Sequence, residues 1–108
     1  MIRIDAAWLA GEPLDMRAGT ETALARVVRV FGAAQPHHAY LFANRSGTRV
    51  KILVHDGFGL WLLARRLHQG RFHWSANQQQ QLNPAQLQAL VTGLPWHRLG
   101  DDAAIRIA

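Results

Sequence analysis

The sequence of 108 residues contains no cysteine. That absence excludes disulfide bonds, zinc sites built on thiolates and cysteine nucleophiles. Acidic residues are also scarce, because seven Asp and Glu stand against twelve Lys and Arg, a formal charge of +5. Eleven of the twelve cations are arginine, whose planar fork of donors suits phosphate and carboxylate groups. The composition therefore favours an anionic partner, with a GC-rich genome as the alternative source of the arginine excess.

Long hydrophobic runs are missing as well. The longest apolar stretch, Phe58 to Ala64, is far too short to span a membrane. Residues 1–17 carry Asp5, Glu12 and Asp15 and no apolar run, unlike a signal peptide. We therefore expect a cytoplasmic protein without a membrane partner. The length fits one domain, which we place at residues 1–99, followed by a C-terminal tail at 100–108.

The pattern of apolar residues and turn signals predicts an α+β fold. One helix is expected from Thr20, as its N-cap, to Gly32, and another is opened by Asn83-Pro84 and ended by Gly93. Residues 1–18 read as extended and residues 75–82 as a polar linker. The strands are expected at residues 39–43, 49–55, 58–67 and 71–74. We predict an antiparallel β-meander of about four to six strands packed on one face against two helices.

The turn at Asp56-Gly57 sets the expected register of the central hairpin, because Asp-Gly is a strong two-residue turn signal. It places His55 opposite Phe58 and leaves Arg65 on the apolar side. Alternation then gives an apolar face of Val50, Ile52, Val54, Trp61, Leu63, Leu67, Phe72 and Trp74. The other face is mixed and carries Arg49, Lys51, Leu53, His55, Phe58, Leu60, Leu62, Arg66, His68, Arg71 and His73. We expect the apolar face to meet the helices and the mixed face to be open or covered by a partner.

Catalytic chemistry is poorly represented. Asp56 is expected in a turn and Glu21 at a helix start, where each has a structural role. Asp15 has no obvious structural role, but one carboxylate does not make a two-metal site. The six histidines show no spacing typical of a metal site. We therefore expect no catalytic residue, no metal and no cofactor, and a protein that is not an enzyme.

Several motifs resemble one known family. They are "LDMRAG" before the first helix, "VKILVHDGFGLWLLARRLHQGRFHW" at the centre and "LNPAQLQALVTGLPW" near the end. The chain resembles, over about residues 7 to 97, the accessory protein called TnpB of bacterial insertion sequences of the IS66 group, which is unrelated to the RNA-guided nuclease of that name. The motif residues are Asp15, Met16, Arg17, Gly19, His55, Asp56, Gly57, Gly59, Leu67, Gly70, Phe72, Trp74 and Trp96. Ser75 stands where the family usually has proline, and Ala18 where it usually has a basic residue.

The resemblance implies a role in transposition without an assigned activity. The leading hypothesis is a non-catalytic accessory protein that binds element DNA through a basic sheet face. The contacts expected are Arg17, Lys51, Arg65, Arg66 and Arg71, then Arg49 and Arg45. The alternative is a subunit that docks the transposase or a second accessory protein through Leu53, Phe58, Leu60 and Leu62 without contacting DNA. The sequence leaves open the partner, any DNA sequence preference, the oligomeric state and whether the copy is active, decayed or domesticated.

Overall fold

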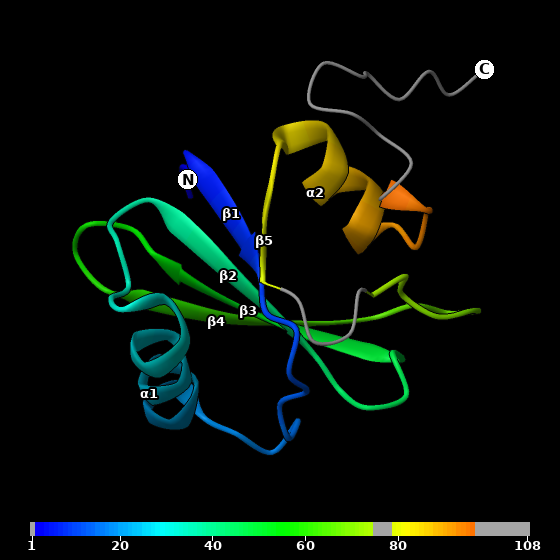
Figure 1. Cartoon of the computed structure of the whole chain (residues 1–108), viewed down its shortest axis with the longest axis horizontal. Helices are drawn as coiled ribbons and strands as arrows, with labels where there is room; N and C mark the ends of the chain where they lie inside the picture. The colour runs from blue at the N-terminus through cyan, green and yellow to red at the C-terminus, as the bar shows by residue number, and fades with distance from the viewer. Residues whose placement is uncertain (1, 75–78, 97–108) are drawn as a thin grey trace.

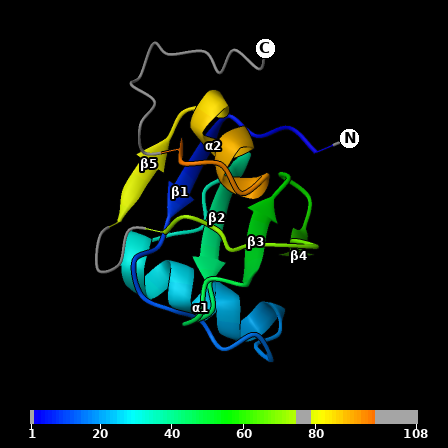
Figure 2. The same ribbon diagram turned by 90° about the vertical axis from the view of Figure 1, so that its right-hand side faces the viewer.

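A computed structural model describes residues 2–74 and 79–96, so the tail predicted at 100–108 lies outside the described residues. The elements in chain order are β1 (Ala6–Leu9), α1 (Thr20–Phe31), β2 (His38–Ala43), β3 (Arg49–His55), β4 (Leu60–Arg66), β5 (Gln80–Leu82) and α2 (Pro84–Val91). The strands form one sheet in the order β4-β3-β2-β1-β5, and Figure 2 shows the five strands side by side. The predicted α+β class is confirmed.

The sheet is mixed rather than a simple antiparallel meander. β1 pairs in parallel with β2, with Ala6 beside His38, whereas β2–β3, β3–β4 and β1–β5 are antiparallel. The cause is α1, which lies between β1 and β2 in the chain. It returns the chain to the end of the sheet at which β1 began, so β2 runs in the same direction as β1. A strand–helix–strand crossover of this kind makes its two strands parallel.

The two helices cover opposite faces of the sheet (Figure 1), so the prediction that both pack on one face is wrong. On the α1 side, Tyr40, Phe42 and Leu53 are buried together with Val27 of the helix. On the other side, Leu41 and Val54 are buried with α2 and Trp96. The physical reason lies in β2, where five of the six residues are buried. A strand that is apolar on both faces requires cover on both.

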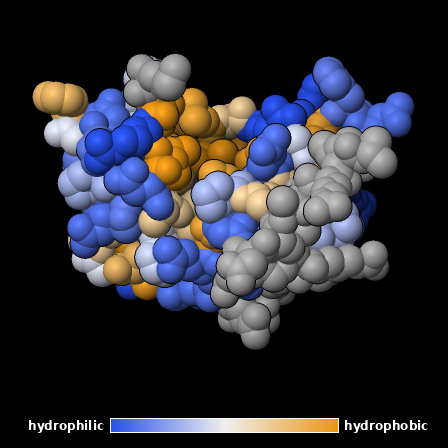
Figure 3. All heavy atoms as spheres, turned by 90° about the horizontal axis from the view of Figure 1, so that it is seen from above, coloured by the Kyte–Doolittle hydropathy of each residue, from blue (hydrophilic) through white to orange (hydrophobic). Residues whose placement is uncertain are grey.

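The α2 side of the sheet is not covered everywhere. On β4, Trp61 is 47% exposed and Leu63 is 37% exposed. Figure 3 looks onto this side and shows apolar side chains gathered in one region of the surface. Part of the sheet's apolar face is therefore open to solvent.

The β3–β4 connection is a four-residue loop, longer than predicted. His55 lies opposite Leu60, so the pairing is shifted by two residues from the predicted partner Phe58. A shift of two leaves every side chain on its predicted face, because side chains alternate with a period of two. Asp56 shapes the loop: its Oδ1 accepts the N–H groups of Phe58 and Gly59, and its Oδ2 accepts Trp61 Nε1.

The chain after β4 differs from the prediction. Residues 71–74 form no strand, yet Phe72 is buried and its N–H bonds the carbonyl of Gly47 in the β2–β3 loop. Trp74 donates its Nε1–H to the carbonyl of Ala10 at 2.8 Å. Residues 80–82, predicted as part of a linker, instead form β5, which pairs antiparallel with β1 at the edge of the sheet.

The helix boundaries follow local signals closely. The prediction of Thr20 as N-cap is off by one, since Gly19 is the N-cap and Thr20 the first helical residue of α1. In α2, Asn83 and Gln86 form the reciprocal side-chain to backbone bonds of a capping box, with Pro84 at the first helical position. Within the described ranges, no helix has the length and apolar character that a membrane crossing requires.

Candidate nucleic-acid interface

On β3 and β4, one end of the α1 side of the sheet carries Arg49, Lys51 and Arg66. Arg49 is directly opposite Arg66, and Lys51 is opposite Ala64. The next pair along the same face, Leu53 and Leu62, belongs to the core cluster under α1. The predicted mixed face is therefore divided: α1 covers its centre, and the cations remain outside the helix.

Two adjoining recesses bring these cations together. The smaller, about 300 Å³, is lined by Met16, Arg49, Lys51, Ala64, Arg65 and Arg66. The larger, about 760 Å³, is lined by Glu12, Pro13, Leu14, Asp15, Met16, Asn44, Arg45, Ser46 and Arg49. They share Met16 and Arg49. We call Arg45, Arg49, Lys51 and Arg66 the basic groove.

The floor of the basic groove is held by two anchors. Lys51 Nζ donates to the carbonyl of Ala18 at 2.7 Å, which fixes the segment between β1 and α1 against β3. Asn44 Oδ1 accepts the N–H groups of Thr48 and Arg49, at 2.9 and 3.1 Å, and so shapes the β2–β3 loop. The sequence reasoning missed Asn44, although an Asn directly after a strand and before Ser-Gly is a typical turn former.

Three cations of the groove have no carboxylate partner. Among the described residues, the side chains of Arg45, Arg49 and Arg66 make no ion pair or hydrogen bond, and all three are exposed. Like charges directly opposite each other on neighbouring strands are destabilising, as Arg49 and Arg66 are here. An anion bound between them would relieve that repulsion.

Arg17, one of the predicted DNA contacts, is paired with a carboxylate. Its guanidinium forms a two-point pair with Asp15, at 2.9 Å to Oδ2 and 3.2 Å to Oδ1, and its backbone N–H also bonds Oδ1. These hydrogen bonds lower the pKa of Asp15 from 3.8 to about 2, and the Asp15 carboxylate raises the pKa of Arg17. Asp15 lines the larger recess, and Arg17 balances its charge.

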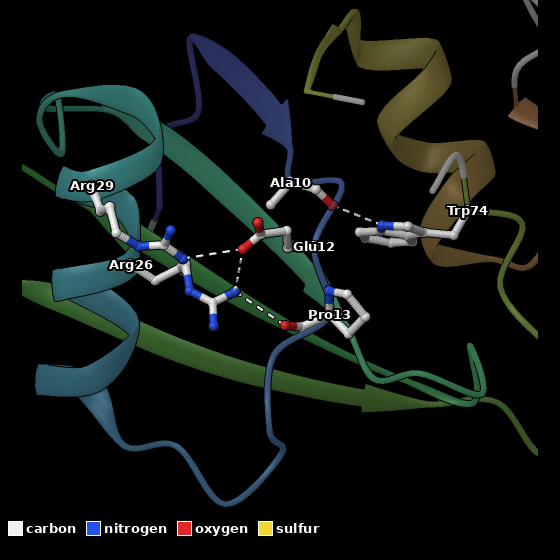
Figure 4. A network of polar contacts seen from close by, with 6 residues as sticks. All are labelled: Ala10, Glu12, Pro13, Arg26, Arg29 and Trp74. Carbon is white, nitrogen blue, oxygen red and sulfur yellow. Dashed lines mark hydrogen bonds and ion pairs between the residues drawn. The ribbon is translucent and has the colours of Figure 1, made fainter. Parts of the chain in front are cut away.

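Two other arginines are also engaged, as Figure 4 shows. Arg29 and Arg26 lie 3.1 and 3.8 Å from the carboxylate of Glu12, and Arg26 donates to the carbonyl of Pro13. These contacts tie α1 to the segment after β1. One carboxylate thus serves two arginines, whereas Arg45, Arg49 and Arg66 have no such partner among the described residues.

Arg65 and Arg71 lie apart from the groove's open cations. Arg65 borders the smaller recess, but its side chain belongs to the α2 face, where Nε donates to the carbonyl of Val91. This confirms the predicted position of Arg65 on the apolar face. Arg71 is exposed in the segment after β4 and lines neither recess.

The predicted protein-interaction surface is largely part of the core. Leu53 is fully buried, and Leu60 and Leu62 are half-buried and pack on the cluster under α1. Phe58 is the exception, because it is fully exposed in the β3–β4 loop. The prediction that these four residues form one open surface is therefore wrong, since α1 covers the face that three of them share.

Many of the motif residues hold the fold together. Trp96 is fully buried and donates Nε1–H to the carbonyl of His73 at 2.6 Å. Asp56 shapes its loop, and Gly57 and Gly70 have positive φ values of 91° and 81°, which favour glycine. Within residues 2–74 and 79–96, no group of three His, Asp or Glu is arranged to hold a metal ion.

The family model described as IS66 Orf2 like protein matches residues 5–101. The chain is 34% identical over 92 residues to the uncharacterized protein y4hO of Sinorhizobium fredii (strain NBRC 101917 / NGR234), an alignment that covers 82% of this chain and 80% of that protein. No solved structure matches.

Proposed function

The chain belongs to the IS66 Orf2-like family, and on that premise we propose that it is a non-catalytic accessory protein of transposition that binds DNA through the basic groove. The family supports an insertion-sequence accessory role. The DNA-binding part of the proposal rests on one observation: Arg45, Arg49 and Arg66 gather at adjoining recesses without a carboxylate partner among the described residues.

The geometry favours the phosphate backbone as the ligand of the groove. Arginine guanidinium groups bind phosphate oxygens through parallel hydrogen bonds. Neither helix offers a basic recognition surface, because Arg26 and Arg29 of α1 are engaged by Glu12 and α2 carries no cation. We therefore expect binding with little base discrimination and a steep dependence on salt.

The non-catalytic part of the proposal rests on the state of the carboxylates. Asp15 is paired with Arg17, Glu12 with Arg29, and Asp56 accepts three hydrogen bonds in its loop. Each of these acids therefore already has a structural partner.

Fluorescence anisotropy with a short labelled duplex tests the DNA-binding proposal. Affinity should fall between about 50 and 200 mM salt, and each phosphate contact removed should reduce the slope of log K against log salt by about 0.9. Arg49→Ala and Arg66→Ala should each show that reduction. Arg3→Ala is the matched control, because it removes the same charge from an exposed arginine paired with Asp5. Absence of binding at low salt, or equal losses in all three variants, would overturn the proposal.

The second candidate function is docking of the transposase or another accessory protein without DNA contact. Full exposure of Phe58 in a hydrogen-bonded loop favours it. Co-purification with the element's transposase should be lost in Phe58→Asp and kept in Val28→Asp, an exposed apolar position on α1. If DNA binding persists in Phe58→Asp while transposase capture is lost, this function gains support; capture unaffected by the change contradicts it.

A further inference from the structure

The open edge of the sheet at β4 is unusually well suited to strand pairing. β4 is the last strand in the order, and all seven of its residues pair with β3 on one side. Within the described part of the chain, no strand pairs with its other side. Edge strands are commonly protected by proline, by bulges, by charged side chains or by being short. The charged residues of β4, Arg65 and Arg66, stand only at its end. Residues 60–66 contain no proline and no glycine, and their register with β3 is unbroken.

Exposed apolar side chains concentrate at this edge. Six large hydrophobic residues of the described chain are exposed, and Phe58, Trp61 and Leu63 are three of them. Trp61 and Leu63 lie on the face of the sheet that α2 covers. However, α2 packs over β1 and β5, which are at the opposite edge from β4, and so it does not cover these two side chains fully. Half-buried Ile52 lies opposite Leu63 on β3 and continues the surface inward. The apolar area visible in Figure 3 lies on this side of the molecule.

We propose that β4 binds the same strand of a second copy of this chain, antiparallel and related by a two-fold axis at Leu63. With the axis at Leu63, each of the seven residues from Leu60 to Arg66 lies opposite a β4 residue of the second copy. A shift to either neighbouring two-fold register leaves strand residues unpaired at the ends. The two five-stranded sheets then join edge to edge, an isologous contact as closed dimers require.

The side-chain pairing across the two-fold axis supports the second copy as the occupant. In this register Arg65 lies opposite Trp61 of the partner copy, and Arg66 opposite Leu60, so no arginine faces another across the pair. Trp61 and Arg65 share the α2 face, which allows the guanidinium to approach the indole ring, a favourable cation–π contact. Leu63 meets its own counterpart on the same face. A parallel pairing would instead place Arg65 beside Arg65.

The dimer and the DNA-binding proposal respond to salt in opposite directions. Each copy carries a formal charge of +5, so general repulsion opposes association and salt should strengthen the dimer. Phosphate binding weakens with salt. The inference does not depend on the proposed function, and one can fail while the other stands.

The absence of native cysteine makes a direct test possible. Leu63→Cys places one thiol next to the two-fold axis, where directly opposed Cβ atoms lie about 4.5–5.5 Å apart, close to the range that a disulfide allows. Oxidation should give a covalent dimer at least tenfold faster than for Gln81→Cys, the matched control at an exposed position of β5, the opposite edge.

Sedimentation analysis of the unmodified chain completes the test. We expect a dimer whose population rises with concentration, and a monomer for Leu63→Lys, with an unchanged circular dichroism spectrum because Leu63 is partly exposed. A monomer at every concentration overturns the proposal and leaves the edge free for a strand of another protein. A dimer that Leu63→Cys fails to cross-link faster than Gln81→Cys overturns it as well.

Discussion

At the scale of single residues, the arginines divide by partner rather than by position in the chain. Arg17, Arg26 and Arg29 bind carboxylates, whereas Arg45, Arg49 and Arg66 have none among the described residues. Arg26 and Arg29 tie α1 to the segment between β1 and α1, and Arg17 pairs within that segment. The second remains able to bind an external anion.

The Asp15–Arg17 pair gives a prediction for pH dependence. The pKa of Asp15 is about 2 because its carboxylate accepts hydrogen bonds from Arg17. A lowered folded-state pKa stabilises the fold above the ordinary value of 3.8, and this contribution is lost as the pH falls through about 2. NMR titration of the Asp15 carboxyl carbon should show that midpoint, and Arg17→Gln should move it toward 3.8. A midpoint unchanged by Arg17→Gln would contradict the pairing; Arg3→Gln is the control.

At the scale of elements, the ends of α2 and the loops around β3 show how local side chains set geometry. Asn83 Oδ1 accepts the N–H of Gln86, while the Gln86 side chain accepts the N–H of Asn83. Asn44 and Asp56 act similarly in the loops on either side of β3. Each of these side chains satisfies backbone donors that the neighbouring strand or helix leaves unpaired.

The capping box of α2 is expected to contribute measurably to stability. Asn83→Ala removes the acceptor for the Gln86 N–H, and loss of such a cap costs about 1 kcal/mol. Urea unfolding should show a lower midpoint with an unchanged slope. Asn83→Asp keeps an acceptor at the same position and should lose much less. Equal stability of the alanine variant and the unmodified chain would show that the cap is not needed.

At the scale of the whole molecule, two tryptophans join segments distant in sequence: Trp96, which is buried, and Trp74, which is half-buried. Trp74 donates a hydrogen bond to the carbonyl of Ala10, 64 residues earlier in the chain. Trp96 connects the segment that follows α2 to the carbonyl of His73. Because residues 67–74 form no strand, these contacts and buried Phe72 hold them on the α2 side of the sheet.

Trp96 is therefore expected to be among the most costly positions to truncate. It is fully buried in the cluster under α2, and Trp96→Ala should destabilise the fold by about 3–5 kcal/mol. Trp96→Phe keeps part of the ring volume but loses the bond to the His73 carbonyl, so its loss should be smaller. Thermal unfolding followed by circular dichroism measures both. Similar losses in the two variants would show that the hydrogen bond, rather than the packing, dominates.

The candidate site was predictable only in part. Arg49, Lys51 and Arg66 were among the expected contacts, because charges that alternate with apolar residues identify the outward positions of a strand. Arg45, which was also expected, lies in the β2–β3 loop. Arg17 and Arg65 were expected beside them, but Asp15 and the Val91 carbonyl engage them. Asp15 is two residues from Arg17, whereas Val91 is 26 residues from Arg65. That second contact exists only once α2 has packed on the sheet.

By itself, the sequence determined the two helices, the strands β2, β3 and β4, and the face to which each side chain of the β3–β4 hairpin points. These properties depend on residues close together in the chain, and an error of two residues in register leaves the faces unchanged. Only the tertiary structure decided the parallel pairing of β1 with β2, the addition of β5 and the placement of α1 and α2 on opposite faces. Those features depend on which apolar surfaces meet across long separations in sequence, where the free energy comes from burial on both sides of β2. Because α1 covers the centre of the mixed face, the cations at its end form a groove rather than an open sheet.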